Sequence, residues 1–230
     1  MTNTTPNKKS TLTQDQQNVL LSAGAPQERL ADGVLLASEE KLLAWLAKAQ
    51  AFMAARYPQE SFTFVGVDNT QMRNRICFLH AVSASAPDAR FAVRVSAEEI
   101  TESYYALLKR GEMEEIVREA FRQADVPVGL EVSLNGLYGE GYDPALPLKE
   151  TLADGRLASV SGFAYVELPE LAALQEHLQM TLRAAGLCGG FALCAVNAPI
   201  SEVLGRTGAI RPYIAQRVFV SLPAQTQEVK

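Results

Sequence analysis

The sequence predicts an α+β fold with a mainly antiparallel sheet and helices packed on one face. Residues 38–57 repeat apolar side chains at helical spacing, and residues 62–67 follow as a short apolar run typical of a buried strand. Residues 91–96 alternate apolar and polar side chains, as a strand with one solvent-facing side does. Short turns between the strands of the first half favour antiparallel neighbours.

The helix predicted at residues 38–57 carries the clearest apolar stripe of the chain. Its apolar side chains fall on one face of a 3.6-residue period. They are Leu42, Trp45, Leu46, Ala49 and Met53. Pro58 ends the helix, because a proline ring disfavours the helical conformation of the preceding residue. We expect this stripe, including Trp45, to be core rather than a ligand site.

The remaining elements follow from the same two periodicities. Strands are predicted at 76–82, 91–96, 130–134, 162–167, 191–196 and 213–222. Helices are predicted at 98–110 and 112–124, and a further helix begins at Pro169 and ends at Gly186. Residues 135–154 are rich in glycine and proline and read as a long loop.

The chain therefore divides into two α+β halves. The expected parts are a disordered tail with a short irregular segment at 1–37, a first half at 38–134, a loop at 135–157, a second half at 158–224 and a tail at 225–230. A shift of 129 residues superimposes residues 42–68 on 171–197 with six identities, so a duplicated helix–strand unit is an open alternative.

Composition excludes several classes of function. The net charge is −5 and no basic run is present, so nucleic-acid binding is not expected. No apolar run is long enough to span a bilayer, and no apolar leader opens the chain, so we expect a cytoplasmic protein that does not enter a membrane. Three cysteines, Cys77, Cys188 and Cys194, lack paired or zinc-ligand spacing, and we expect free thiols, no metal and no cofactor.

Part of the first half resembles a recurring pattern in uncharacterised proteins of Gram-positive bacteria. In that pattern a helix ends in a tyrosine-containing turn, strands follow, and an F-x-V-x-V…I-x-D-x-Y segment leads into helices. The matching residues lie at 56–62 and at Phe91, Val93, Val95, Ile100 and Tyr104. The aspartate of the pattern is not matched, because Glu102 and Ser103 stand there. The resemblance implies a small α+β module without a known activity.

Two sets of residues are candidates for binding. Tyr138 and Tyr142 lie in the glycine-rich stretch NGLYGEGYDP, where mobile tyrosines could form a recognition tip. Arg73, Arg75 and Arg94 could form a small anion site. The alternatives are a tolerant linker for the loop and solvated surface charges for the arginines.

No catalytic motif stands out, and no catalytic residue is assigned. His80 lies in a predicted strand and fits a core or edge position better than a general base. The sequence favours a non-enzymatic binding module whose partner is another protein or a second copy of the chain. The alternative is a small hydrolase or transferase whose site only the fold assembles. A deep polar pocket with His80 and a carboxylate favours the enzyme, and a flat apolar patch favours the module.

Overall fold

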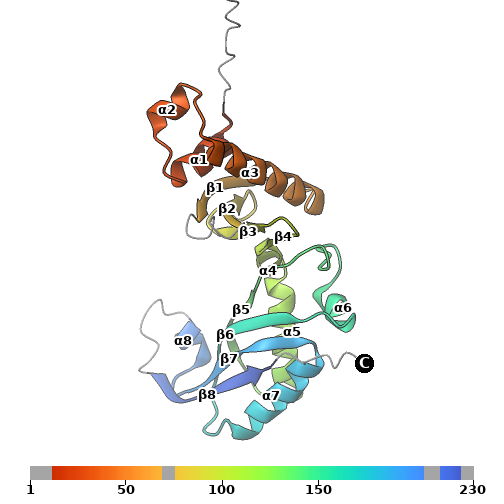
Figure 1. The fold of residues 1–230 in the computed structure, drawn as a ribbon. Helices are drawn as coiled ribbons and strands as arrows, with labels where there is room; N and C mark the ends of the chain where they lie inside the picture. The colour runs from red at the N-terminus through yellow and green to blue at the C-terminus, as the bar shows by residue number, and fades with distance from the viewer. Residues whose placement is uncertain (1–11, 69–75, 205–212, 224–230) are drawn as a thin grey trace, which may run out of the picture. The chain divides into compact units, whose positions relative to one another are not determined.

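A computed structural model describes residues 12–68, 76–204 and 213–223, and its chain forms two compact units (Figure 1). Unit 1 contains Met1–Tyr104 and Leu137–Glu140, and unit 2 contains Tyr105–Gly136 and Gly141–Lys230. The contacts therefore divide the chain at Tyr104, whereas the sequence suggested a division within 135–157. Each unit holds a four-stranded sheet, and the α+β class with mainly antiparallel pairing is confirmed.

Unit 1 is an antiparallel meander backed by helices. Its helices are α1 (Gln14–Ser22), α2 (Gln27–Ala31) and α3 (Ala37–Arg56). Its strands are β1 (Phe62–Asp68), β2 (Cys77–Ser83), β3 (Phe91–Val95) and β4 (Ile100–Glu102), in the order β1-β2-β3-β4. The predicted meander is confirmed, and two ordered helices, α1 and α2, lie where the sequence suggested an irregular segment.

The apolar stripe of α3 packs on this sheet as predicted. Leu42, Leu46, Ala49 and Met53 are at most 1% exposed and join β2 and β3 side chains in one hydrophobic cluster. Trp45 belongs to the same cluster at 9% exposure, so its ring is core. Burial of this stripe, more than helix propensity, is what stabilises α3.

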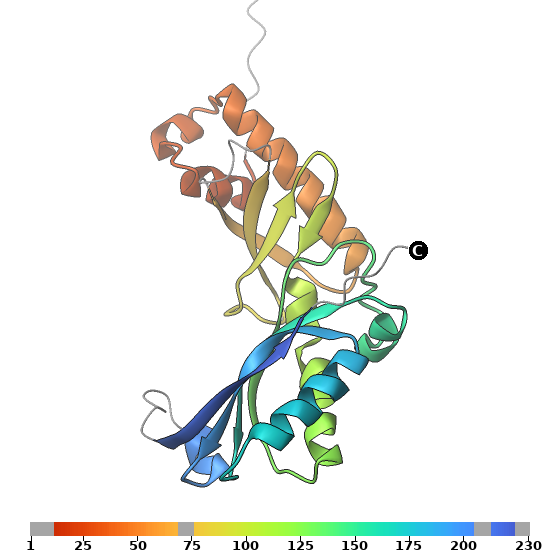
Figure 2. The same ribbon diagram turned by 60° about the horizontal axis from the view of Figure 1, so that its bottom comes forward.

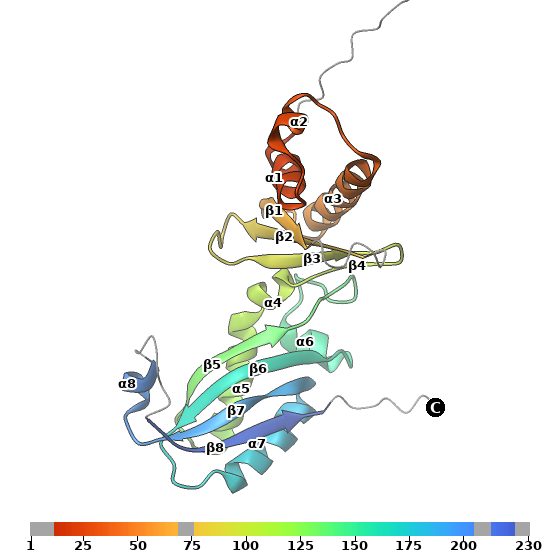
Figure 3. The same ribbon diagram turned by 60° about the vertical axis from the view of Figure 1, so that its left-hand side comes forward.

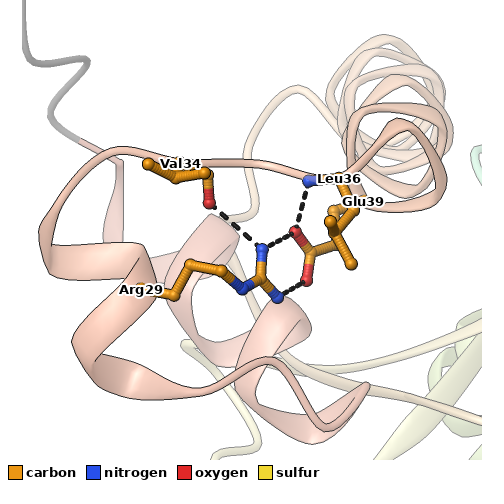
Figure 4. A network of polar contacts seen from close by, with 4 residues as sticks. All are labelled: Arg29, Val34, Leu36 and Glu39. Carbon is orange, nitrogen blue, oxygen red and sulfur yellow. Dashed lines mark hydrogen bonds and ion pairs between the residues drawn. The ribbon is translucent and has the colours of Figure 1, made fainter.

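An ion pair fixes the beginning of α3 against α2 (Figure 4). The Arg29 guanidinium binds the Glu39 carboxylate through both of its terminal nitrogens and also donates to the Val34 carbonyl at 3.1 Å. Glu39 in turn accepts the Leu36 backbone N–H at 2.8 Å, which caps the helix. The hydrogen bond from Arg29 holds the pKa of Glu39 below its ordinary value.

We expect this pair to make stability depend on pH in acid. Because the folded pKa of Glu39 lies below its unfolded value of about 4.3, the contribution is complete above that value and is lost as pH falls through the folded pKa. Glu39→Gln should therefore unfold more easily than wild type at neutral pH, and the difference should shrink below about pH 4. Urea midpoints of both proteins across pH measure this, and a constant difference would contradict it.

Both edges of the first sheet are covered by the chain itself. On the β1 edge, Asn18 of α1 donates to the Phe64 carbonyl at 3.1 Å, and Ser22 accepts the Val67 N–H at 2.8 Å. On the β4 edge, Tyr138 and Glu102 exchange two backbone hydrogen bonds, so the segment 137–140 extends the sheet. Sheet edges that are paired or capped in this way disfavour the addition of another strand.

The single helix predicted at 98–110 is wrong. Ser96 accepts the N–H groups of Glu98 and Glu99, which forms a tight turn, and β4 then pairs back onto β3. Helix α4 (Tyr104–Leu108) begins only after β4, and α5 (Arg110–Gln123) follows at once. Strand pairing across β3 thus overrides the helical spacing of the apolar residues.

Unit 2 is a second four-stranded sheet with order β5-β6-β7-β8. Its strands are β5 (Gly129–Asn135), β6 (Ala158–Val166), β7 (Leu187–Val196) and β8 (Ile214–Leu222). Its further helices are α6 (Leu148–Ala153), α7 (Ala172–Ala184) and α8 (Ile200–Leu204). Strands β6 and β7 are parallel, because α7 crosses over between them, and the other pairs are antiparallel.

Helices α5 and α7 lie side by side on one face of this sheet, and α8 lies on the other (Figures 2 and 3). Their buried residues, including Phe121 and Leu178, meet the inward side chains of the strands. The loop predicted at 135–154 contains one ordered helix, α6. None of the described helices combines the length and apolar character needed to cross a membrane.

The proposed duplication is matched only in part by the sheets. The order helix then strand recurs in α3–β1 and in α7–β7. Strand β1 is an edge strand, however, whereas β7 lies between a parallel and an antiparallel neighbour. The two units therefore share a local order but use it at different positions of their sheets.

Candidate functional site

The face of the second sheet opposite α5 and α7 carries exposed aromatic side chains. Strand register places Glu131, Phe163, Ala192 and Phe219 opposite one another across β5, β6, β7 and β8. Because side chains two residues apart share a face, Arg217 lies on this side too. We call the surface formed by these five residues the open face.

The open face is organised by stacking. The Arg217 guanidinium lies 5.3 Å from the centre of the Phe163 ring, within the range of a cation–π contact. The Phe163 ring stacks on Tyr165 with an interplanar angle of 7° and 6.2 Å between centroids. The Tyr165 hydroxyl donates to Glu131 at 2.8 Å. A cation, two rings and a carboxylate thus form one connected row.

Two large apolar side chains of this face remain in contact with solvent. Phe219 is 57% exposed and Phe163 is 37% exposed, although both belong to regular strands. Phe219 covers the backbone of Gly190, where a Cβ atom would lie 2.9 Å from the ring and 2.3 Å from the Val220 carbonyl oxygen. Ala192 lies between them in the strand order and is buried, so the two exposed rings flank a small residue.

One end of this face is closed by α8. Tyr165 and Cys194 pack with Val203 in a small apolar cluster that includes Ile200 at its margin. Burial, and after it the hydrogen bond to the Glu131 carboxylate, raises the pKa of Tyr165, so its hydroxyl remains a proton donor at neutral pH. The phenol therefore positions Glu131 and is not a general base.

A buried polar network in unit 1 is the main alternative site. Glu102 is fully buried and accepts hydrogen bonds from Tyr57 at 2.7 Å and from Arg56 at 3.2 Å. Burial, and after it the Glu102 charge, raises the pKa of Tyr57 far above its ordinary value. The network joins the end of α3 to β4, and this arrangement fits a structural role.

The tyrosines predicted as a recognition tip belong to different units, and neither is fully exposed. Tyr138 is 3% exposed and pairs through its backbone with Glu102 in unit 1. Tyr142 is half-buried in unit 2, where its hydroxyl donates to the Leu157 carbonyl at 2.8 Å and its ring lies edge-on to Tyr105. Removal of either ring is therefore expected to cost stability, while partner binding by this loop stays a prediction.

The predicted anion site is described only in part. Arg73 and Arg75 lie outside the described residues. Arg94 forms an ion pair with Glu99 across the β3–β4 turn, so its charge already has an acidic partner. Binding by these three arginines likewise stays a prediction.

Three cavities lined by described residues lack the arrangement expected of an enzyme. Cavities of about 440 and 530 Å³ in unit 1 and about 430 Å³ in unit 2 are lined by neither His80 nor His177. His80 is half-buried on β2, and His177 meets the Ala120 carbonyl. Among the described residues, no cluster of histidine, cysteine and acidic side chains is arranged to hold a metal ion.

The residues of the open face were missed by sequence reasoning, although a signal existed. In β8, Arg217 and Phe219 alternate with Val218 and Val220. One side of the strand is therefore apolar, and the other side carries a charged residue and a large aromatic ring. An aromatic residue on the solvent-facing side of a strand indicates an exposed apolar surface. The register of all four strands was needed to place Phe163 and Glu131 in the same row as Phe219.

Comparisons with known proteins add little to this geometry. No protein-family model matches the chain, and no curated protein matches it. A solved structure of a DUF5037 family protein from Ruminococcus gnavus is similar at a TM-score of 0.34 and 12% identity. That alignment covers 75% of this chain and 88% of the other.

Proposed function

We propose that this protein is a non-enzymatic interaction module that binds another protein through the open face of its second sheet. The observation that carries the proposal is the joint exposure of Phe163 and Phe219 in regular strands, beside an arginine without a carboxylate partner among the described residues. Aromatic and arginine side chains dominate the binding energy of protein interfaces. A surface in which such groups are held rigidly in a sheet binds at a low cost in entropy.

The free edge of β8 is less suited to binding than the face. Gln175 of α7 donates to the Phe219 carbonyl of this strand at 2.9 Å. This contact hinders addition of another strand at β8, so a partner is expected to meet the face.

The alternative of a small hydrolase or transferase has less support. The most buried carboxylate of the described residues, Glu102, is joined to Arg56 and Tyr57, and none of these three residues lines the three cavities given above. The cysteines carry no sign of activation, because burial raises the pKa of each thiol. Unpaired thiols fit a reducing compartment, and we propose the cytoplasm as the location.

Photo-crosslinking tests the proposal. A benzoyl-substituted phenylalanine analogue at position 219 keeps the ring and should form covalent adducts with a partner in cells. The matched control places the analogue at Met180 of α7, which is 69% exposed on the other side of the sheet. Adducts from position 219 without adducts from position 180 support the proposal, and equal yields from both positions would contradict it.

A further inference from the structure

We infer that the partner of the open face is a second copy of this chain, bound face to face about a twofold axis. This inference rests on the proposed function and names the partner. The open face carries one positive and one negative side chain, Arg217 on β8 and Glu131 on β5. A surface with complementary groups on itself can bind its own copy, and such isologous dimers are the commonest oligomers.

The charges of the open face are placed for cross-pairing. Glu131 is exposed on the outermost strand at one side of the sheet, and Arg217 is exposed on the outermost strand at the other side. No ion pair joins either group to another described residue, since Glu131 accepts only the Tyr165 hydroxyl and Arg217 lies over Phe163. A twofold axis that runs along the strands through the middle of the face would place β8 of each copy over β5 of the other. Arg217, turned away from Phe163, would there meet Glu131 of the other copy.

The apolar centre between these charges fits the same arrangement. Phe163 and Phe219 lie in the row of Ala192, which is small and buried. In a face-to-face pair, each copy would cover the two exposed rings of the other, on the part of the face that α8 leaves uncovered. Two sheets that pack in this way form a sandwich whose core is apolar and whose rim is polar.

Charge substitutions on the open face distinguish self-association of the chain from binding of a different protein. Arg217→Glu leaves two carboxylates on the open face, and Glu131→Arg leaves two guanidinium groups there. In a twofold dimer each single variant brings like charges together, so its dissociation constant should rise at least about tenfold. An equimolar mixture of the two variants should regain the dimer, because every contact then joins opposite charges.

Sedimentation velocity of the full chain at concentrations up to about 100 µM measures these outcomes. We expect a wild-type dimer, two weakened single variants and a restored dimer in the mixture, while Met180→Glu on α7 leaves the dimer unchanged. Far-ultraviolet circular dichroism spectra that match the wild type show that the variants are folded. A monomeric wild type at every concentration, or a dimer that both single variants keep, would overturn the inference. A monomeric wild type that still forms adducts with another protein from position 219 would reject the second copy and leave the proposed function standing.

Discussion

Leu46→Ala and Trp45→Ala should each bring the protein close to unfolding. Leu46 is 1% exposed and Trp45 is 9% exposed, and both lie in the cluster that joins α3 to the first sheet. Truncation of such side chains costs about 2–5 kcal/mol, partly from lost burial and partly from the cavity left behind. That is a large share of a typical total stability of roughly 5–15 kcal/mol.

Urea denaturation followed by circular dichroism measures this loss. Lys48→Ala on the same helix is the matched control, since Lys48 is exposed and surface substitutions usually change stability by less than about 0.5 kcal/mol. A Trp45→Ala variant that melts at the wild-type temperature would show that the ring serves a ligand and not the core.

Replacement of the buried carboxylate in unit 1 should be at least as damaging. Glu102 is fully buried, and Glu102→Ala removes the acceptor of hydrogen bonds from Arg56 and Tyr57. Loss of one partner from a buried ion pair costs about 3–5 kcal/mol, because the remaining charge stays in a poorly solvated setting. The Arg56 side chain is only 7% exposed, so water cannot easily replace the carboxylate.

A double variant separates the charge effect from simple loss of packing. Arg56→Met together with Glu102→Leu removes both charges and keeps most of the volume. It should be more stable than Glu102→Ala, because apolar replacement of a whole buried pair is often neutral. Equal stability of the single and double variants, measured by urea denaturation, would show that packing and not charge governs this position.

The sequence predicted those elements whose burial follows a local period. The stripe of α3 and the alternation of β3 are local patterns, and the structure confirms both. The failure at 98–110 has a non-local cause, because the pairing of β4 with β3 and with Tyr138 is decided by residues distant in the chain. Periodicity cannot report such pairing.

The candidate site could not be predicted from the sequence for the same reason. Phe163 and Phe219 are 56 residues apart in sequence and become neighbours only through the register of β6, β7 and β8. The glycines near Tyr138 in the sequence predicted a loop tip. Tyr138 is instead buried, because its backbone pairs with an edge of the first sheet. Local composition predicted a flexible loop, whereas a long-range backbone bridge holds this tyrosine in place.

The central claim is that the open face is a protein-binding surface, and crosslinking from position 219 tests it most directly. The analogue replaces one aromatic ring with another at the most exposed apolar residue of the face, so it reports on contact without removing the contact. The account predicts adducts from position 219, with the mass of two 25.0 kDa chains if the partner is a second copy, and none from position 180. A folded protein that forms no adduct from position 219 would contradict it.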